Sequence, residues 1–161
     1  MNTLPEEINF IKQQLGEKDL YIHDVIDLAF MIKKLVSIGV LDFSSLIHLS
    51  PKHEWENLTR MLPYLPKQLV IDHLDQLLDG FMDLNWSGSR ILFGYLAEMD
   101  IEPLKASFDR VIKKAIDLND TDWVYFLLVF MESDRVNLQN HFTDEIERCR
   151  SYLIRQGIDV D

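Results

Sequence analysis

Apolar and polar residues alternate with the period of an α-helix along almost the whole chain, whereas the period-two alternation of strands is weak. Apolar residues recur three and four positions apart, which places them on one face of a helix. Glycine and proline residues interrupt the periodic stretches, as they do at helix ends. The pattern predicts helices over residues 4–15, 21–38, 54–62, 66–80, 86–99, 102–118, 123–132 and 136–156, with a short helix or turn at 43–49.

One short signal occurs twice in the chain. Asp83-Leu84-Asn85-Trp86 and Asp120-Thr121-Asp122-Trp123 lie 37 residues apart, and each separates an amphipathic segment from an apolar one. Asn85 and Asp122 stand directly before the tryptophans, where their side chains suit the N-cap of the following helix. Asp83 and Asp120 suit the preceding turn, because a carboxylate there accepts a bond from a nearby backbone N–H.

The tryptophans predict a repeat architecture. Trp55, Trp86 and Trp123 each lead a helix pair, at spacings within the range of helix-turn-helix repeats. The predicted fold is therefore all-α: a single domain over residues 1–161 in which antiparallel helix pairs stack as a short HEAT-like α-solenoid. Residues 1–49 are expected to form an N-terminal helical cap, and residues 50–161 about three helix pairs.

The same residues are the candidates for contact with a partner. The tryptophans are expected to wedge between helices, because each covers a large apolar area. Alternatively, Trp55 is exposed beside His53 and Glu54 as a binding anchor, since tryptophan is enriched at interface hot spots. Glu54 and Glu56 are then candidate partner-binding residues. Asp83 and Asp120, besides forming turns, would then line one edge of the array and meet a basic partner.

Net charge narrows the class of partner. The formal charge is −11, with 7 basic against 12 acidic residues in 1–80 and 9 against 15 in 81–161. The acidic excess is therefore spread along the chain. A nucleic-acid binder needs a basic stripe, and an anionic membrane attracts basic segments, so neither partner is expected. The charge fits a solubilising surface or one that is complementary to a basic protein.

Location follows from the single cysteine and from the start of the chain. Cys149 excludes an internal disulfide and lies on an apolar helix face, which predicts a buried, unreactive thiol in a reducing compartment. Residues 1–7 lack the basic and apolar regions of a signal peptide. The longest apolar run, Trp123–Met131, is far shorter than the roughly 20 residues of a membrane span. We expect a cytoplasmic protein.

Residues that could carry chemistry form no recognisable set. No two of the five histidines have the spacing of a helical zinc pair, and no phosphate-binding loop or nucleophile elbow occurs. We therefore expect no catalytic residue, no cofactor and no metal. Ser87-Gly88-Ser89 could hold an anion at a helix start, but small residues that allow close helix packing are the simpler interpretation. An enzyme would at least require Asp72, His73 and Asp75 to gather on one accessible face, and His73 is expected in the core instead.

The stretch from Leu77 to Glu132 resembles a small helical-repeat domain found in uncharacterised bacterial proteins. The resemblance lies in Leu77–Ser87, where an apolar helix precedes a D-x-N-W-P motif, and in Asp120–Tyr125, which matches a D-x-x-W-aromatic helix start. Ser87 replaces the proline of the motif. The family resembles HEAT-like α-solenoids, and the resemblance of this stretch implies a link to bacterial toxin-immunity loci, with which some relatives belong. No catalytic residues are attributed to it.

These observations favour a non-enzymatic protein-binding module. In its most concrete form it is an immunity protein that neutralises a bacterial toxin by covering the active site with an acidic surface, because acidic surfaces accelerate association with basic partners. The alternative is a structural or scaffold repeat protein with an apolar groove for a partner helix. Salt-dependent binding favours the first function, and salt-insensitive, tryptophan-dependent binding favours the second.

Overall fold

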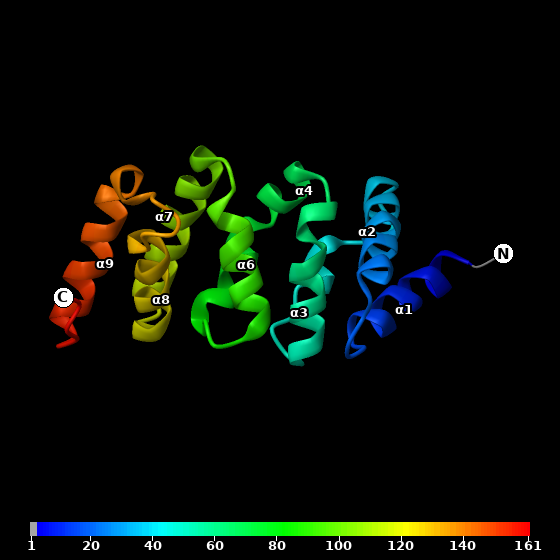
Figure 1. Ribbon diagram of the computed structural model, residues 1–161, viewed down its shortest axis with the longest axis horizontal. Coiled ribbons are helices and arrows are strands. Elements are labelled where there is room, and N and C mark those ends of the chain that lie inside the picture. Colours follow the sequence, from blue (N-terminus) through cyan, green and yellow to red (C-terminus); the bar gives the residue numbers. More distant parts are fainter. Residues whose placement is uncertain (1–2) are drawn as a thin grey trace.

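The helices lie in one row that follows the order of the sequence, and the two ends of the chain lie at opposite ends of this row (Figure 1). A computed structural model describes residues 3–161, and every regular element in that range is helical, which confirms the predicted all-α fold. The α-helices are α1 (Leu4–Leu15), α2 (Ile22–Ser37), α3 (Lys52–Met61), α4 (Lys67–Asp72), α5 (Leu74–Leu77), α6 (Ser87–Ala97), α7 (Ile101–Asp117), α8 (Thr121–Glu132) and α9 (Thr143–Arg155). Short 3-10 helices are η1 (Phe43–Leu46), η2 (Leu62–Tyr64), η3 (Leu78–Met82) and η4 (Gln139–His141).

Packing along the row runs from each helix to its neighbours. The most extensive contact joins α3 to α6, and α8 packs on both α7 and α9. The helices α5, α7 and α9 contact one another in succession. At the other end, α1 and α2 both pack on α3. The structure is thus a stack of helices, and the division into a cap over 1–49 and repeats over 50–161 stays a prediction.

Trp55 of α3 fills the junction between α3, α6 and η3. Its side chain is fully buried, and Gly80 of η3 and Gly88 of α6 lie against the indole ring. A Cβ atom at either glycine would approach ring atoms to well under 3.0 Å, so both positions must lack a side chain. The indole N–H donates to Ser89 Oγ (3.1 Å), and the Ser89 hydroxyl donates to the Gly80 carbonyl (2.5 Å).

Trp123 of α8 plays a comparable part in the next unit. It is also fully buried, and its indole N–H donates to the carbonyl oxygen of Leu78 (3.0 Å). The ammonium of Lys114 lies 5.5 Å from its ring centroid, within the range of a cation–π contact. Trp86 is half-buried and packs against the core. The predicted wedging role is confirmed for Trp55 and Trp123, whereas Trp86 keeps part of its surface exposed.

Phenylalanines fill the centre of the C-terminal half. Phe81 of η3 lies 6.1, 6.4 and 5.6 Å from the ring centroids of Phe93 (α6), Phe108 (α7) and Phe130 (α8), respectively. Phe142, just before α9, extends the cluster through Phe108 (5.5 Å). Aromatic pairs at these separations add stability beyond that of area burial alone. The short helix η3 thereby connects three longer helices.

Ion pairs link successive helices on the polar side of this core. Arg110 of α7 donates from two guanidinium nitrogens to Asp75 of α5 (2.7 and 2.9 Å), which also accepts a bond from Ser107. All four basic side chains of α7 pair with carboxylates within the described residues. One of these pairs, Lys105 with Glu145 of α9, places the glutamate almost completely out of solvent. The α5, α7 and α9 helices are therefore held together electrostatically as well as by packing.

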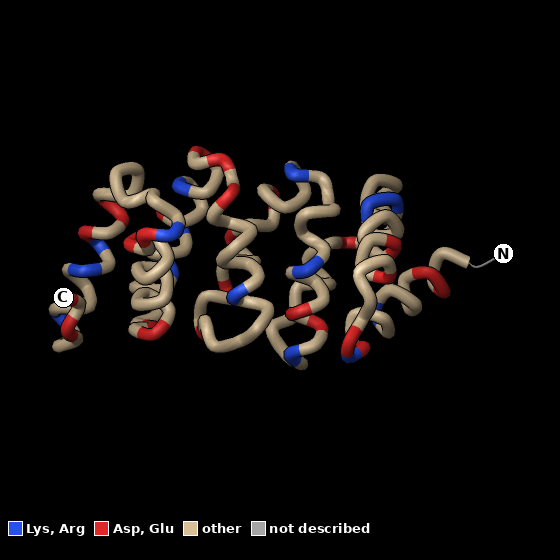
Figure 2. The backbone as a smooth tube through the Cα atoms, viewed as in Figure 1, with Lys and Arg blue, Asp and Glu red and all other residues tan. Residues whose placement is uncertain are grey.

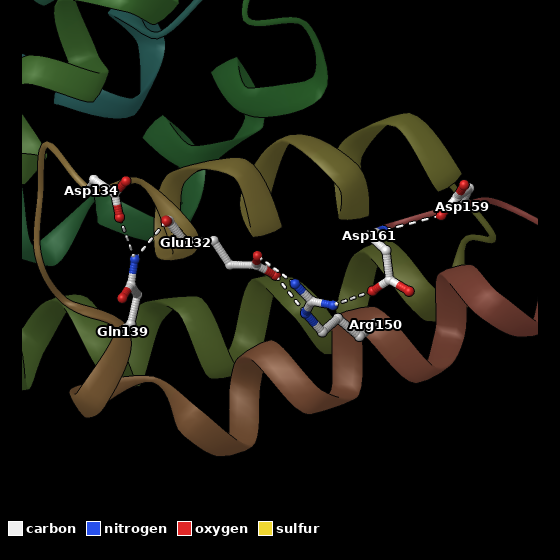
Figure 3. Close-up of polar contacts among 6 residues, drawn as sticks. All are labelled: Glu132, Asp134, Gln139, Arg150, Asp159 and Asp161. Atoms are coloured by element: carbon white, nitrogen blue, oxygen red, sulfur yellow. Dashed lines mark hydrogen bonds and ion pairs between the residues drawn. The ribbon is translucent and has the colours of Figure 1, made fainter.

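Arg150 of α9 organises the C-terminal end (Figure 3). Its guanidinium donates two bonds to the Glu132 carboxylate of α8 (2.7 and 2.6 Å) and a longer one to Asp161 (3.4 Å). The Gln139 side chain donates to the Glu132 carbonyl (2.7 Å) at the end of α8. A bidentate arginine–carboxylate pair fixes orientation as well as distance. The last pair of helices and the chain beyond Arg155 are thus tied together at one point.

Two predicted helices differ in the structure, one by division and one by a later start. The helix predicted over 66–80 divides into α4, α5 and η3, because the His73 ring bonds the Leu69 carbonyl (2.8 Å) and the backbone there has ψ of 13°. The helix predicted over 136–156 begins only at Thr143. Asn137 adopts a left-handed φ of +52°, which a helix interior does not allow.

The predicted N-caps are also wrong by one or two positions. Trp86, not Asn85, is the N-cap of α6, and it makes no side-chain capping bond. Asp120, not Asp122, caps α8 by accepting a bond from the Trp123 backbone N–H (3.1 Å). Asp120 caps the free N–H of the third helical residue, Trp123. The helix α8 therefore begins at Thr121, two residues before its first apolar residue.

The two glycines of α6 give a matched test of the Trp55 junction. Gly88→Ala should destabilise the protein by about 1–3 kcal/mol, because the new methyl group overpacks the indole site. Gly94→Ala, in the same helix, should stabilise it by about 0.5–1 kcal/mol, because nothing lies within 4 Å of a Cβ there. Denaturant unfolding of both variants measures the difference. Equal effects would show that the indole does not exclude a side chain at position 88.

The Asp75 pair should make stability depend on pH. Burial raises the pKa of the Asp75 carboxyl, but hydrogen bonds from Arg110 and Ser107 outweigh burial, and the pKa lies below its ordinary value. A carboxyl with a lowered folded-state pKa stabilises the fold above its unfolded pKa of about 3.9, and that contribution is lost as pH falls through the lower value.

We therefore expect Asp75→Asn to cost up to about 1 kcal/mol at neutral pH, a small value because the pair is about half exposed. The difference from the wild type should shrink below pH of about 4. Urea unfolding at neutral and acidic pH provides the measurement. Asp27→Asn on the exposed side of α2 is the control, and a similar loss there would contradict a specific role of Asp75.

Candidate functional site

The structure separates the residues predicted to bind a partner. Trp55 is fully buried between Gly80 and Gly88, so the hypothesis that it is an exposed anchor is wrong. The reason is that the two glycines leave space for the indole ring. This space cannot be recognised from the residues next to Trp55 in the sequence. Glu54 and Glu56 are half-buried on different sides of α3. Glu54 faces a small depression beside α1 and η1, whereas Glu56 lines a polar hollow beside residues 17–20.

Asp83 and Asp120 form turns, as one of their two predicted roles requires. Asp83 accepts a bond from the Asn85 backbone N–H (2.8 Å), and Asp120 accepts one from the Trp123 N–H. The turns before α6 and before α8 lie at the same lower edge of the row in Figure 1. Both carboxylates are half-buried and already hold backbone groups. Contact of this edge with a basic partner stays a prediction.

The minimum cluster required for an enzyme does not assemble. Asp75 is engaged by Arg110 and Ser107 of α7, and Asp72 accepts a bond from Gln68 (2.7 Å). His73 bonds the Leu69 carbonyl and presents its ring to Phe43 (4.9 Å between centroids). The prediction of a packed, hydrogen-bonded histidine is confirmed. Ser87-Gly88-Ser89 likewise serves close packing, since Gly88 and Ser89 contact the Trp55 indole.

An open groove between α3–α4 and α6 is the best candidate site in the described residues. Its volume is about 540 Å³, within the range of ligand-binding clefts. One wall comes from the end of α3, from η2 and from α4, and the other comes from α6 and the turn that follows it. The apolar lining consists of Pro63, Leu65, Ile71, Ile91, Tyr95 and Met99. None of these residues was predicted as a site residue.

The α6 wall presents one regular face to the groove. Ile91, Gly94, Tyr95 and Glu98 lie at positions i, i+3, i+4 and i+7 of a helix, and all four line the groove. The buried residues of α6 lie on another side, where Gly88 and Ser89 contact Trp55 of α3. Burial raises the pKa of the Tyr95 hydroxyl, which places this phenol in a partly desolvated site. Tyr95 is therefore neutral at physiological pH and offers a hydrogen-bonding group beside apolar surface.

Charges of opposite sign stand on the two walls. Arg60 and Lys67 belong to the α3–α4 wall, and Glu98 and Asp100 belong to the α6 wall. Figure 2 shows acidic positions in the α6–α7 turn and a basic position near the start of α4, on the same edge of the row. None of the four takes part in an ion pair among the described residues. The groove thus has an apolar floor between a basic rim and an acidic rim.

Gly94 leaves part of the α6 wall without a side chain. It lies in the middle of α6, and a Cβ there would meet nothing within 4 Å. Gly88, in the same helix, is required by contact with Trp55, but no packing contact requires Gly94. A glycine in a helix interior costs roughly 1 kcal/mol relative to alanine. Sequence reasoning could have singled out this glycine, because it interrupts an apolar helical pattern without ending it.

Metal ligands, membrane spans and the single thiol were the other features of interest within residues 3–161. No group of three or more His, Cys, Asp or Glu side chains in this range is arranged to hold a metal ion. No helix in the range combines the length and apolar composition needed to cross a bilayer. Cys149 is fully buried, and burial raises the pKa of its thiol to about 12. The thiolate fraction of the folded protein is therefore very small near neutral pH.

Cys149 should react slowly with thiol reagents while the protein is folded. Reaction requires the thiolate, and both the raised pKa and burial suppress it. We expect labelling by a disulfide reagent at pH of about 8 to be at least about tenfold slower than in denaturant, where the pKa returns to about 8.5. Absorbance of the released thiol measures both rates. Equal rates would contradict the buried position of Cys149.

Known proteins offer no independent assignment. No family model, curated protein or solved structure matches this chain. The resemblance of Leu77–Glu132 to the bacterial helical-repeat domain therefore stays a prediction. The features of this chain that bear on its function are the groove, its two charged rims and the surface charge.

Proposed function

We propose that this chain is a non-enzymatic protein-binding module and that the groove between α3–α4 and α6 is its contact site. The observation that carries the proposal is the open apolar floor flanked by rims of opposite charge. Exposed apolar surface rimmed by polar groups is typical of interaction sites. The partner would bind by burying side chains in the groove in a defined orientation. Such binding requires no chemical reaction.

The acidic surface supports a partner of basic character. The net charge is −11, and the basic side chains of α7 are paired with carboxylates, three of them on neighbouring elements and one, Asp117, on α7 itself. Such a surface attracts a basic protein over distances of about a Debye length, roughly 8–10 Å at physiological salt. The narrower form of the proposal is a cytoplasmic immunity protein that covers the active site of a basic bacterial toxin. The resemblance noted for Leu77–Glu132 and the charge both favour this form.

A scaffold role is the second candidate, and the groove itself favours it. A structural repeat protein would use the same apolar floor to hold a partner helix, with little contribution from net charge. The two forms differ in their response to salt. Binding guided by the acidic surface weakens as ionic strength rises, whereas binding dominated by apolar burial changes little.

Gly94 provides the variant that tests the contact site. Gly94→Trp should fill the groove without disturbing the core, because the side chain enters open space. Asp27→Trp, on the exposed side of α2, adds the same side chain away from the groove and is the matched control. We expect immobilised wild-type protein and the Asp27→Trp variant to retain the same cytosolic partner at about 50 mM salt, and the Gly94→Trp variant to lose at least about 90% of it. Quantitative mass spectrometry of the retained proteins provides the measurement.

Two results decide between the forms. Elution of the partner at about 500 mM salt supports the acidic surface and the immunity function, and resistance to that salt supports the scaffold function. Equal retention by wild type and Gly94→Trp, with both folded by circular dichroism, would rule out the groove as the contact site.

A further inference from the structure

We infer that the groove holds one amphipathic α-helix of a partner protein, seated with an apolar residue over Gly94, an acidic flank on Arg60 and Lys67, and a basic flank on Glu98 and Asp100. This inference rests on the proposed function and names the chemistry of the partner. Three features of the groove carry it: a bare helix face, a glycine without a packing role, and charges separated between the walls.

The bare face has the geometry of a helix-packing surface. Ile91, Gly94, Tyr95 and Glu98 follow the i, i+3, i+4, i+7 spacing from which helices build ridges and grooves. The helix preceding α6 in the chain is short and divided: α4 spans Lys67–Asp72 and α5 only Leu74–Leu77, whereas α7 spans Ile101–Asp117. The groove face of α6 is consequently not covered by a long helix within residues 3–161.

Gly94 points to close approach of another backbone. A glycine is favoured where a main chain must pass near a ligand or a second main chain, because a Cβ would hold the two apart. Side chains at position 94 meet no obstacle in this chain, so the constraint lies with the occupant. A small apolar molecule can adjust to an alanine methyl group, whereas a helix lying across α6 contacts it at a fixed axis separation of about 8–10 Å. The glycine therefore favours a helix over a small ligand.

Charge separation sets the direction in which that helix lies. Lys67, Glu98 and Asp100 are exposed, and Arg60 is half-buried with one bond to Asn57 (3.3 Å). Exposed pairs of this kind contribute little affinity, about 0–1 kcal/mol each, but they penalise the reversed arrangement. A helix with an acidic and a basic flank therefore fits one way across the apolar floor. The rims do not determine the net charge of the whole partner protein. The acidic surface of this chain is what favours a basic partner.

Selection from a phage-displayed library of random 16-residue peptides tests the inference, because such a peptide spans about 24 Å as a helix. Peptides are selected on the wild-type protein after depletion on Gly94→Trp. We expect the enriched sequences to place apolar residues at i, i+3 or i+4, and i+7, with acidic residues on one side of this stripe and basic residues on the other. The selected peptide should become more helical on binding, as measured by circular dichroism.

Charge reversals then test orientation. Lys67→Glu and Glu98→Lys each suit their helix end, because Lys67 begins α4 and Glu98 follows the last turn of α6, so neither should harm the fold. Each should weaken the selected peptide by about fivefold, and Asp27→Lys on α2 should leave binding unchanged. A peptide with its acidic and basic flanks exchanged should bind the Lys67→Glu/Glu98→Lys double variant more tightly than it binds the wild type.

Several outcomes would overturn the inference. These are enrichment of extended or proline-rich peptides, absence of enrichment over the Gly94→Trp protein, and indifference of binding to both reversals. Self-association of the wild type that Gly94→Trp abolishes would assign the groove to a second copy instead. If the cytosolic partner is lost with Gly94→Trp but the peptides are not helical, only the inference fails. If that partner is unaffected by Gly94→Trp, the proposed function fails as well.

Discussion

The seating of one indole between two glycines fixes the middle of the molecule. Trp55 of α3 occupies a slot that exists only because Gly80 and Gly88 lack side chains, and its N–H joins a chain of bonds through Ser89 to the Gly80 carbonyl. The contact sets both the position and the rotation of α6 against α3. Because Gly88 and Ser89 of α6 are fixed at this junction, the face that carries Ile91, Gly94 and Tyr95 is directed into the groove.

The helices follow from the helical period of apolar residues, which can be recognised directly in the sequence. Apolar periodicity located most helices, and the buried positions of Trp123 and Cys149 and the packed, half-buried position of His73 agree with their places on apolar faces. The errors arise where a side chain competes with the backbone or where a residue adopts a left-handed conformation. His73 divides one predicted helix and Asn137 delays another, and neither effect is encoded in hydrophobic spacing.

The candidate site was harder to predict than the fold, because it is made from three separate segments. Arg60, Ile71 and Tyr95 each look like ordinary residues on the side of an amphipathic helix, and their meeting depends on how α3, α4 and α6 pack. Trp55 illustrates the opposite error. Tryptophan marks interface hot spots and helix cores alike, and only the glycines 25 and 33 residues later decide between them.

Linear stacking has a consequence for how this molecule opens. Since the helices pack mainly on elements close to them along the row, stability is a sum of local contributions and of interfaces between adjacent units, as in repeat arrays. Partial unfolding then starts at the two ends, where α1 packs on α2 and α3 and α9 packs on α7 and α8 from one side only, and spreads inward. The α3–α6 junction is the most extensively packed interface and lies away from both ends. Backbone amides around the groove should therefore exchange last with solvent, which makes the binding surface a rigid platform on a molecule whose ends fray.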